Sequence, residues 1–195
     1  IAINEVSILR PERQFLQVGA ECIGQENYLA DIEILTLAFE SLITVGIRDI
    51  TVDFCSPIFL KYIIDNFSIN NIGSFIKYLK RKDIKKTLDH VRSKSNKKFI
   101  NDLIECRGNI TKKYQSLEKL KINKKISQEI DRILKIDKFI KNKFNKITVN
   151  IDFTENKPHD YYSGINFTIF AKNVRGEIAN GGRYKTRSLK GESAT

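Results

Sequence analysis

The hydrophobic positions of the first third of the chain predict helix, strand and helix in turn. Between residues 30 and 45 apolar side chains recur with a helical period, and Gly46 offers a C-terminal stop. Residues 50–54 alternate between apolar and polar like a short strand. Ser56-Pro57 then provides a cap and a first-turn proline for the next helix.

The middle of the chain, residues 69–144, has a helical pattern throughout. Breaks are expected at Asn70-Asn71, at residues 94–96 and at Gly108-Asn109, where polar residues and glycine interrupt the apolar period. The last helix is expected over residues 127–144. Its apolar stripe consists of Ile130, Ile133, Leu134, Phe139 and Ile140.

After the helical stretch the pattern alternates, which predicts strands. Residues 147–153 place four apolar side chains on one face, and residues 154–159 form a loop. Two further strands, 161–171 and 174–180, are expected to pair as an antiparallel hairpin that turns at Lys172-Asn173.

Helices that are flanked by strands on both sides predict an α+β fold with a helical insertion. The boundaries follow from where the pattern changes. Residues 1–68 are the first part of the core, residues 69–146 are a basic helical insertion, and residues 147–195 are the second part of the core.

The net charge of +11 is concentrated in the middle of this 195-residue chain. Residues 77–146 hold 23 Lys and Arg against 8 Asp and Glu, a net charge of +15, and the rest of the chain has −4. Such a basic field can face RNA, a membrane surface or an acidic protein. However, Lys outnumbers Arg by 24 to 10, which favours solvated helix faces over a nucleic-acid surface. No apolar run approaches the roughly 20 residues that span a bilayer, so no membrane partner is expected.

The metal-ligating residues are sparse and scattered. Cys22, Cys55 and Cys106 lie far apart without a C-x-x-C pair, and only His90 and His159 could join them as ligands. We therefore expect no metal site, no cofactor and no disulfide framework. A reducing cytoplasm fits this cysteine usage best.

The segment from Arg10 to Gly24 carries a polar alternation that suits ligand recognition. If the segment is a strand, alternate side chains share one face of a sheet. An arginine there suits a carboxylate, a glutamate suits an amine, and a glutamine suits either. A solvent-facing polar strand face explains the same spacing. The alternate residues are Arg13, Phe15, Gln17, Gly19 and Glu21.

Two further segments near the C-terminal end are candidates for a binding site. In His159-Asp-Tyr-Tyr-Ser-Gly-Ile-Asn-Phe167, one tyrosine of the pair can pack in the core while the other lines a pocket. In Ala179-Asn-Gly-Gly-Arg-Tyr184, the paired glycines allow a turn or a close backbone approach to a ligand. Ordinary strand packing and a plain Gly-Gly turn explain these segments equally well.

Taken together, the three segments resemble a known family. Gln17-Val-Gly-Ala-Glu21, Asp160-Tyr-Tyr-Ser-Gly164 and Gly181-Gly-Arg-Tyr184, in this order, are similar to the catalytic core of histidyl-tRNA synthetases and of their paralogue, the regulatory subunit of ATP phosphoribosyltransferase. The resemblance implies the fold of class II aminoacyl-tRNA synthetases: a twisted antiparallel sheet flanked by helices, with a histidine pocket on the sheet.

The resemblance also implies roles for individual residues. Gln17 and Glu21 would contact the amino group and ring of histidine. Tyr161 and Tyr162 would enclose the imidazole, and Gly181-Gly182 would let the ring approach the backbone. Arg13 lies in the same synthetase motif, so it is included in the expected histidine site.

One departure from the synthetase pattern separates the two relatives. Synthetases place an arginine three residues before the aspartate of Asp-Tyr-Tyr, where it steadies the charge that develops during adenylation, whereas this chain has Lys157. Lysine cannot make the same bidentate phosphate contact. The insertion also lacks the Asn-Pro-Leu-Arg-x-Leu-Asp-x-Lys stretch that is usual in synthetases. Both losses favour a protein that binds histidine without activating it.

The function expected from the resemblance is therefore regulatory. The chain would belong to a non-catalytic regulatory subunit that binds L-histidine and controls the first step of histidine biosynthesis through the short catalytic subunit of ATP phosphoribosyltransferase, a glycosyltransferase, with self-association expected as well. The alternatives are a divergent histidyl-tRNA synthetase, with an RNA-facing insertion, and a generic α+β interaction domain. Because the chain has no Met and lacks the family's flanking motifs at both ends, it is expected to be the middle of a longer protein.

Overall fold

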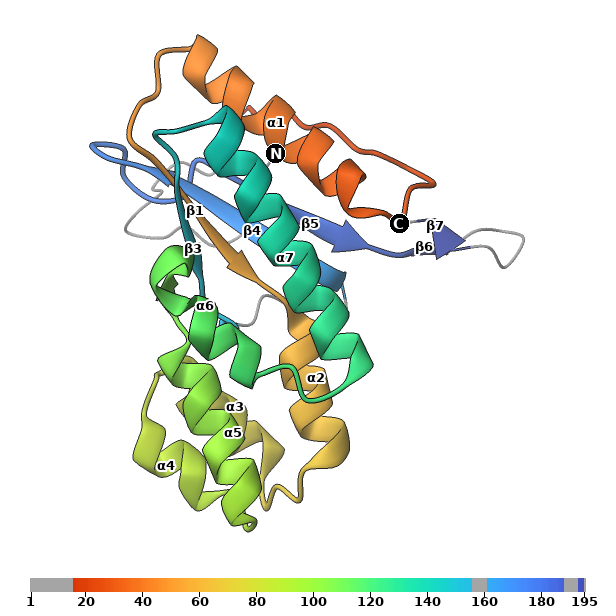
Figure 1. Ribbon diagram of the computed structural model, residues 1–195, viewed down its shortest axis with the longest axis vertical. Coiled ribbons are helices and arrows are strands. Elements are labelled where there is room, and N and C mark those ends of the chain that lie inside the picture. Colours follow the sequence, from red (N-terminus) through yellow and green to blue (C-terminus); the bar gives the residue numbers. More distant parts are fainter. Residues whose placement is uncertain (1–15, 156–160, 188–192, 195) are drawn as a thin grey trace.

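A computed structural model describes residues 16–155, 161–187 and 193–194, and its main feature is a sheet flanked by helices (Figure 1). The helices are α1 (Tyr28–Thr44), α2 (Pro57–Asn66), α3 (Ile72–Lys80), α4 (Ile84–Asp89), α5 (Lys94–Glu105), α6 (Ile110–Lys119) and α7 (Lys124–Lys143). The strands are β1 (Ile50–Cys55), β2 (Gly108–Asn109), β3 (Thr148–Ile151), β4 (Tyr162–Ala171), β5 (Ala179–Tyr184), β6 (Thr186–Arg187) and β7 (Ser193–Ala194).

The main sheet is mixed and has the strand order β2-β3-β1-β4-β5, while β6 pairs only with β7 among the described strands. β1 runs parallel to β3 and antiparallel to β4, and β4 and β5 form the expected antiparallel hairpin. The α+β class is confirmed. The sheet contains one parallel pair because the chain leaves β1, passes through all the helices from α2 to α7, and returns beside β1 in the same direction as β3.

Of the two helices expected before residue 69, α2 begins at its predicted cap, whereas α1 begins at Tyr28 behind a cap, Asn27, that the apolar pattern does not predict. The side chain of Asn27 accepts hydrogen bonds from two backbone N–H groups of the first turn of α1, and Ser56 caps α2 ahead of Pro57 in the same way. α1 ends before Gly46, which adopts a φ of 92° that a residue with a Cβ rarely reaches. The signals at Ser56-Pro57 and Gly46 are local in the sequence, so the pattern predicts them well.

The break expected at residues 94–96 is wrong. Lys94 opens α5, which has Ser93 as its N-cap residue, and the chain turns before it, at residues 90–93. The polar run resembles a loop only because it forms the exposed start of an amphipathic helix whose buried face begins at Phe99. Further breaks, at residues 81–83 and 120–123, separate helices that the pattern merged.

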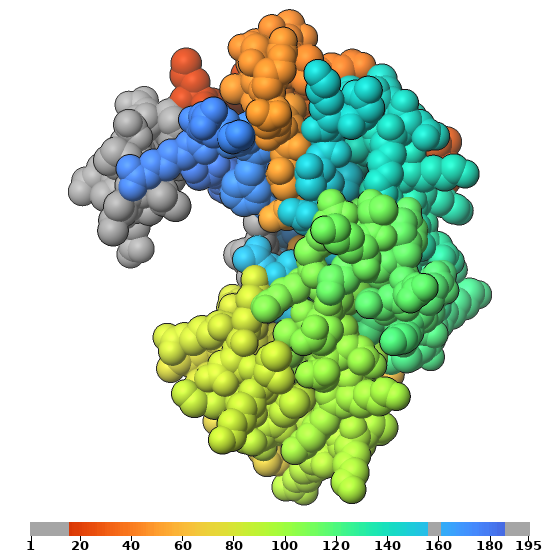
Figure 2. Space-filling view, turned by 60° about the vertical axis from the view of Figure 1, so that its left-hand side comes forward, coloured from red at the N-terminus to blue at the C-terminus, as the bar shows by residue number. Residues whose placement is uncertain are grey.

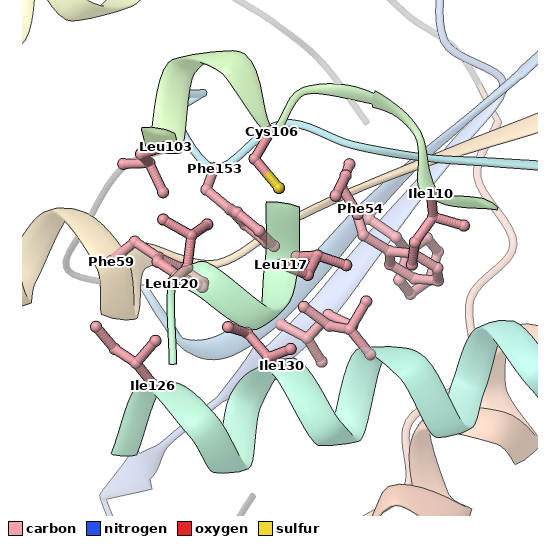
Figure 3. Packing of buried hydrophobic residues seen from close by; sticks show 14 of the residues in the cluster. Phe54, Phe59, Leu103, Cys106, Ile110, Leu117, Leu120, Ile126, Ile130 and Phe153 are labelled. Atoms are coloured by element: carbon pink, nitrogen blue, oxygen red, sulfur yellow. The ribbon is translucent and has the colours of Figure 1, made fainter. Parts of the chain in front are cut away.

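α1 and α7 lie side by side on one face of the sheet, and the core is buried beneath them (Figure 1). On α7, Ile130, Ile133 and Ile140 are buried as predicted, while Leu134 and Phe139 are half-buried. Ile126 and Ile136 complete the buried stripe. The same core continues into the helical segment, where α5 and α6 contribute side chains that meet those of β1 and α7 (Figure 3).

Phe59 and Phe153 join α2 to the end of the central strands. Their rings stack with centroids 4.0 Å apart and an interplanar angle of 17°, and both side chains are buried. Figure 3 shows this stack between α2 and the residues of α6 and α7. The contact anchors α2 to the residues that directly follow β3.

An ion pair fixes the turn between α3 and α4 to the sheet. The Nζ atom of Lys82 lies 2.6 Å from Oδ2 of Asp152, one residue beyond β3. Burial alone would raise the pKa of Asp152, but hydrogen bonds from Lys82 and from the hydroxyl and N–H of Thr154 outweigh it and leave the pKa below its ordinary value of 3.8.

This ion pair predicts a pH-dependent stability. A carboxyl whose pKa is lowered on folding stabilises the fold above its ordinary pKa, and this contribution is lost as the pH falls through the lowered value. We expect Lys82→Met to reduce the free energy of unfolding by about 1 kcal/mol at pH 7, and the difference from the wild type to shrink below about pH 4. Urea titrations between pH 3 and 7 measure both quantities.

The control for this prediction is Lys61→Met. Lys61 and Asp65 form an exposed pair at 3.9 Å within α2, which is worth little in water. Loss of the Lys61–Asp65 pair should leave the free energy of unfolding within about 0.5 kcal/mol of the wild-type value at every pH. If Lys82→Met behaved like Lys61→Met, the ion pair with Asp152 would have no energetic role.

Among the described residues, the face of the sheet away from α1 and α7 is polar and is not covered by a helix. Figure 2 shows a hollow between the hairpin of β4 and β5 and helices α3 and α4. On this face the amide of Asn150 in β3 donates a hydrogen bond of 3.0 Å to Asp53 in β1. Thr51 of β1 and Thr168 of β4 lie beside this pair. No helix in the described part of the chain combines the length and the apolar character that a membrane span needs.

Candidate functional site

Three tyrosines form a cluster at the open end of the β4–β5 hairpin. Tyr162 opens β4 and pairs with Tyr184, the last residue of β5. The ring of Tyr161 stacks on that of Tyr184, with centroids 5.1 Å apart and planes 11° from parallel. It also meets Tyr162 edge to face at 5.0 Å. Neither member of the Tyr-Tyr pair is a core residue, because Tyr161 is 55% exposed and Tyr162 is half-buried.

Glu21 lies beside this tyrosine cluster, which consists of Tyr161, Tyr162 and Tyr184. The hydroxyl of Tyr184 donates a hydrogen bond to the Glu21 carboxylate, and this bond is the largest cause of a raised pKa of Tyr184. Burial raises the pKa of Tyr162, with smaller contributions from Tyr161 and Glu177. Tyr162 and Tyr184 therefore keep their protons at neutral pH and remain donors, while Glu21 supplies an acceptor.

The segment that carries Gln17 and Glu21 is not a strand in its described part. Residues 16–25 form an irregular chain, with Leu16 and Val18 almost fully exposed on either side of Gln17. A strand requires a partner that supplies ladder hydrogen bonds, and no described strand pairs with these residues. Gln17 therefore lies exposed, and Arg13 lies outside the described residues.

The two glycines of the Gly-Gly-Arg-Tyr run lie inside β5 and form no turn. The predicted strand at residues 174–180 is displaced along the chain, so the strand begins at Ala179. A Cβ at Gly181 would come within 2.6 Å of the Phe167 ring, and one at Gly182 within 2.5 Å of the Asn166 Cβ. Close packing of β5 on β4 therefore requires both glycines, whether or not a ligand binds.

Arg183 occupies the centre of an ion-pair network that the sequence did not reveal. Its Nε donates to Asp31 Oδ1 at 2.7 Å, and its Nη2 donates to Asp31 Oδ2 at 3.2 Å. Arg132 of α7 binds the same carboxylate at 2.9 Å. The side chains of Asp31 and Arg183 are only 9% and 11% exposed. Because Asp31 and Arg183 lie 152 positions apart, no local pattern predicts their pairing.

The network continues to the N-terminus of α2. Glu129 of α7 is buried, accepts a hydrogen bond of 2.6 Å from the Ser56 hydroxyl, and lies 3.9 Å from Arg132. Burial raises the pKa of Glu129, and the Ser56 hydroxyl and Arg132 act in the opposite direction. The network thus joins β5, α1, α7 and α2 beneath the tyrosine cluster.

The described residues contain no group of three or more His, Cys, Asp and Glu side chains placed to hold a metal ion. His90 stacks on Tyr78, and Cys106 is buried, which raises its thiol pKa to about 12. A polar recess of about 490 Å³ lies at the far end of the sheet, where Asp53 and Asn150 line it. It is distinct from the tyrosine cluster, and none of the predicted site residues lines it.

The tyrosine cluster and Glu21 can bind a flat ring that carries an amine. Aromatic rings offer stacking surfaces, phenolic hydroxyls donate hydrogen bonds, and the carboxylate attracts an ammonium group. The structure thus brings Glu21, Tyr161 and Tyr162 together and leaves Gln17 exposed. Lys157, which replaces the synthetase arginine, lies outside the described residues.

Comparison with known sequences gives two kinds of relative. The family model described as histidyl-tRNA synthetase matches residues 4–194. The chain is 28% identical over 194 residues to the ATP phosphoribosyltransferase regulatory subunit of Paramagnetospirillum magneticum, a match that covers 96% of this chain and 49% of the relative. It is 29% identical over 177 residues to the histidine–tRNA ligase of Methanocaldococcus jannaschii, a match that covers 88% of this chain and 41% of the relative. The chain thus spans about half the length of these relatives, or less.

Solved structures show the same fold in both kinds of protein. A chain of the ATP phosphoribosyl transferase (HisG:HisZ) complex from Thermotoga maritima matches with a TM-score of 0.68 and 18% identity, over 88% of this chain and 61% of that one. The histidyl-tRNA synthetase of Nostoc sp. PCC 7120 matches with a TM-score of 0.67 and 17% identity, over 88% of this chain and 44% of that one. Because the two scores are nearly equal, the fold does not separate a regulatory subunit from a synthetase.

Proposed function

The chain belongs to the histidyl-tRNA synthetase family, and on that premise we propose that it is part of a regulatory subunit of ATP phosphoribosyltransferase. In this proposal the subunit binds L-histidine and is not itself catalytic. It controls the first step of histidine biosynthesis through contact with the short catalytic subunit.

The tyrosine cluster with Glu21 beside it is the observation that carries the histidine part of this proposal. The stacked rings of Tyr161 and Tyr184 are half-exposed and suit a planar imidazole, while the hydroxyl of Tyr184 already engages the Glu21 carboxylate. A bound histidine would bring an ammonium group to this carboxylate. Gln17 and Arg13 would complete the site in the binding-competent state.

The sequence favours regulation over catalysis. Lys157 stands where the synthetase pattern has an arginine, and a lysine is a point charge without the planar fork that grips a phosphate. The P. magneticum relative, which matches 96% of this chain, is a regulatory subunit. Control would then operate by linkage: histidine binds more tightly to the inhibited arrangement of the complex and shifts the population towards it.

The test uses the full protein mixed with the short catalytic subunit. We expect the mixture to transfer the phosphoribosyl group faster than the catalytic subunit alone, and histidine to suppress this gain. Tyr162→Ala should raise the Kd for histidine roughly tenfold or more, measured by calorimetry, because it removes an aromatic wall of the site. A mixture with an unchanged rate and unchanged histidine sensitivity would contradict the regulatory role.

A divergent histidine–tRNA ligase is the second candidate, and the M. jannaschii relative favours it. A ligase must activate histidine, so it catalyses ATP–pyrophosphate exchange that depends on histidine. We expect no such exchange from the full protein. Measurable exchange would replace the regulatory proposal with the ligase, in which the basic helices would face RNA.

Three further features belong to the same proposal. We place the protein in the cytoplasm and expect self-association alongside the catalytic partner. We retain the division into core segments 1–68 and 147–195 and an insertion at 69–146. The position of α3 to α5 away from the sheet in Figure 1 supports this division, although β2 and α7 of the insertion pack on core elements.

A further inference from the structure

We infer that Arg183 is a positioning residue that holds the segment bearing Glu21 against the tyrosine cluster and thereby sets recognition of the ligand's amine. The inference rests on the proposed histidine function for the identity of the ligand. Its structural basis is a set of contacts between β5 and the chain that leads into α1.

Arg183 binds the backbone just before α1 as well as Asp31. Its Nη1 donates to the carbonyl oxygen of Gln25 at 3.4 Å, and its Nη2 donates to that of Asn27. Arg132 adds a hydrogen bond of 3.0 Å to the carbonyl of Glu26. Three successive carbonyls are thus fixed by two guanidinium groups, in a segment without regular structure of its own.

Alternation along β5 places the two ends of this segment on opposite faces of the sheet. Arg183 and Tyr184 are neighbours in a strand, so their side chains point to opposite faces. Arg183 reaches Asp31 on the α1 face, and Tyr184 reaches Glu21 on the other. The segment from Glu21 to Asn27 therefore passes around the hairpin and is held on both sides of it.

The Arg183 side chain packs against Gly164. A Cβ at Gly164 would lie 3.4 Å from Cδ of Arg183 and 3.7 Å from Oε1 of Glu129. The Tyr-Tyr-Ser-Gly run thus supplies the aromatic wall and also a surface on which the arginine packs as it reaches Asp31. The shielded setting of the Arg183–Asp31 pair strengthens its attraction and fixes one bidentate geometry.

The position of Glu21 is consequently set by Arg183. Without the fork of the guanidinium, the segment before α1 loses two carbonyl contacts and one of the two arginines on Asp31. The Glu21 carboxylate then has several positions instead of one. A displacement of about 1 Å is enough to cost a large part of a polar contact.

The test measures recognition of the amine separately from recognition of the ring. Calorimetry on the full protein compares L-histidine with imidazolepropionate, which has the same ring and carboxylate and no amine. In Arg183→Lys, which keeps the charge and loses the fork, we expect the Kd for histidine to rise roughly tenfold while the Kd for imidazolepropionate stays constant. In a Glu21→Gln background, Arg183→Lys should have no further effect on histidine. Equal losses for both ligands would overturn the inference.

A measurement without ligand separates this inference from the proposed function. The pKa of Tyr184 is followed by NMR of ring-labelled tyrosine and assigned with Tyr184→Phe. It should move towards its ordinary value of 10.0 in Arg183→Lys, because the Glu21 contact is lost. An unchanged pKa would overturn the positioning role whether or not histidine binds. A changed pKa in a protein that does not bind histidine would refute the proposed function alone.

The matched control is Lys143→Gln. Lys143 and Glu40 also bridge α7 and α1, at 2.8 Å, but both side chains are about half-exposed and lie away from Glu21. This variant should change neither the ratio of the Kd values for histidine and imidazolepropionate nor the pKa of Tyr184. If it reproduced the effect of Arg183→Lys, general loosening of α1 would be the cause.

Discussion

Replacing Phe59 by alanine is expected to lower the free energy of unfolding by about 3–5 kcal/mol. The Phe59 side chain is fully buried in α2 and stacks on Phe153 at the end of the central strands. Truncation removes this stack and leaves a cavity that the surrounding aromatic and aliphatic side chains cannot close without moving whole elements. Urea unfolding of the full protein, followed by circular dichroism, measures the change.

The comparison variant is Leu16→Ala, a truncation of a side chain that is fully exposed. It should change the free energy of unfolding by less than about 0.5 kcal/mol. If Phe59→Ala cost less than about 1 kcal/mol, the packing of α2 on Phe153, just beyond β3, would contribute little to stability. A loss in the expected range supports a core that α2 shares with the sheet.

The sequence predicts those parts of the fold that depend on neighbouring residues. The cap at Ser56, the stop at Gly46 and the alternation of residues 50–54 each involve a few adjacent positions, and all three have their expected place. The false break at residues 94–96 has the opposite cause. There the polar start of α5 looks like a loop until the burial of Phe99 and the residues after it defines a helix face.

Strand pairing is less predictable because its determinants are distant. The parallel pairing of β1 with β3 joins segments that are separated by all the helices of the insertion. The predicted strand, 174–180, stops before the paired glycines because such pairs are typical of turns. In the structure the glycines lie inside β5, where they accommodate Phe167 and Asn166 of the neighbouring strand. Only the register of β4 against β5 reveals that requirement.

The residues of the candidate site are indicated by the family resemblance and not by their chemistry alone. Glu21 and the two tyrosines lie near one another although they are separated by about 140 positions in the sequence, and their roles towards histidine stay predictions. Arg183 was part of a recognised run, yet its partner Asp31 lies on a helix with no distinguishing motif. A residue that acts by positioning others leaves no local signal in one sequence, because its effect depends on which segments it joins.

Replacing Gly182 by alanine is expected to lower the free energy of unfolding by about 2–3 kcal/mol in the absence of any ligand. The new Cβ would meet the Cβ of Asn166 at 2.5 Å and its Cα at 2.7 Å, and a backbone atom of the paired strand β4 cannot move aside as a flexible side chain can. The strain would separate β5 from β4 at the hairpin that carries the tyrosine cluster. Urea unfolding of the ligand-free protein measures the cost.

Gly19→Ala is the matched control, because a Cβ at Gly19 would have no described atom within 4 Å. It should leave stability within about 0.5 kcal/mol of the wild type. The pair of variants decides why the glycines are there. If Gly182→Ala kept its stability and lost only histidine affinity, the glycine would serve the approach of a ligand. A large loss of stability without ligand instead means that the packing of β5 on β4 requires this glycine, and that the hairpin is held rigid before any ligand arrives.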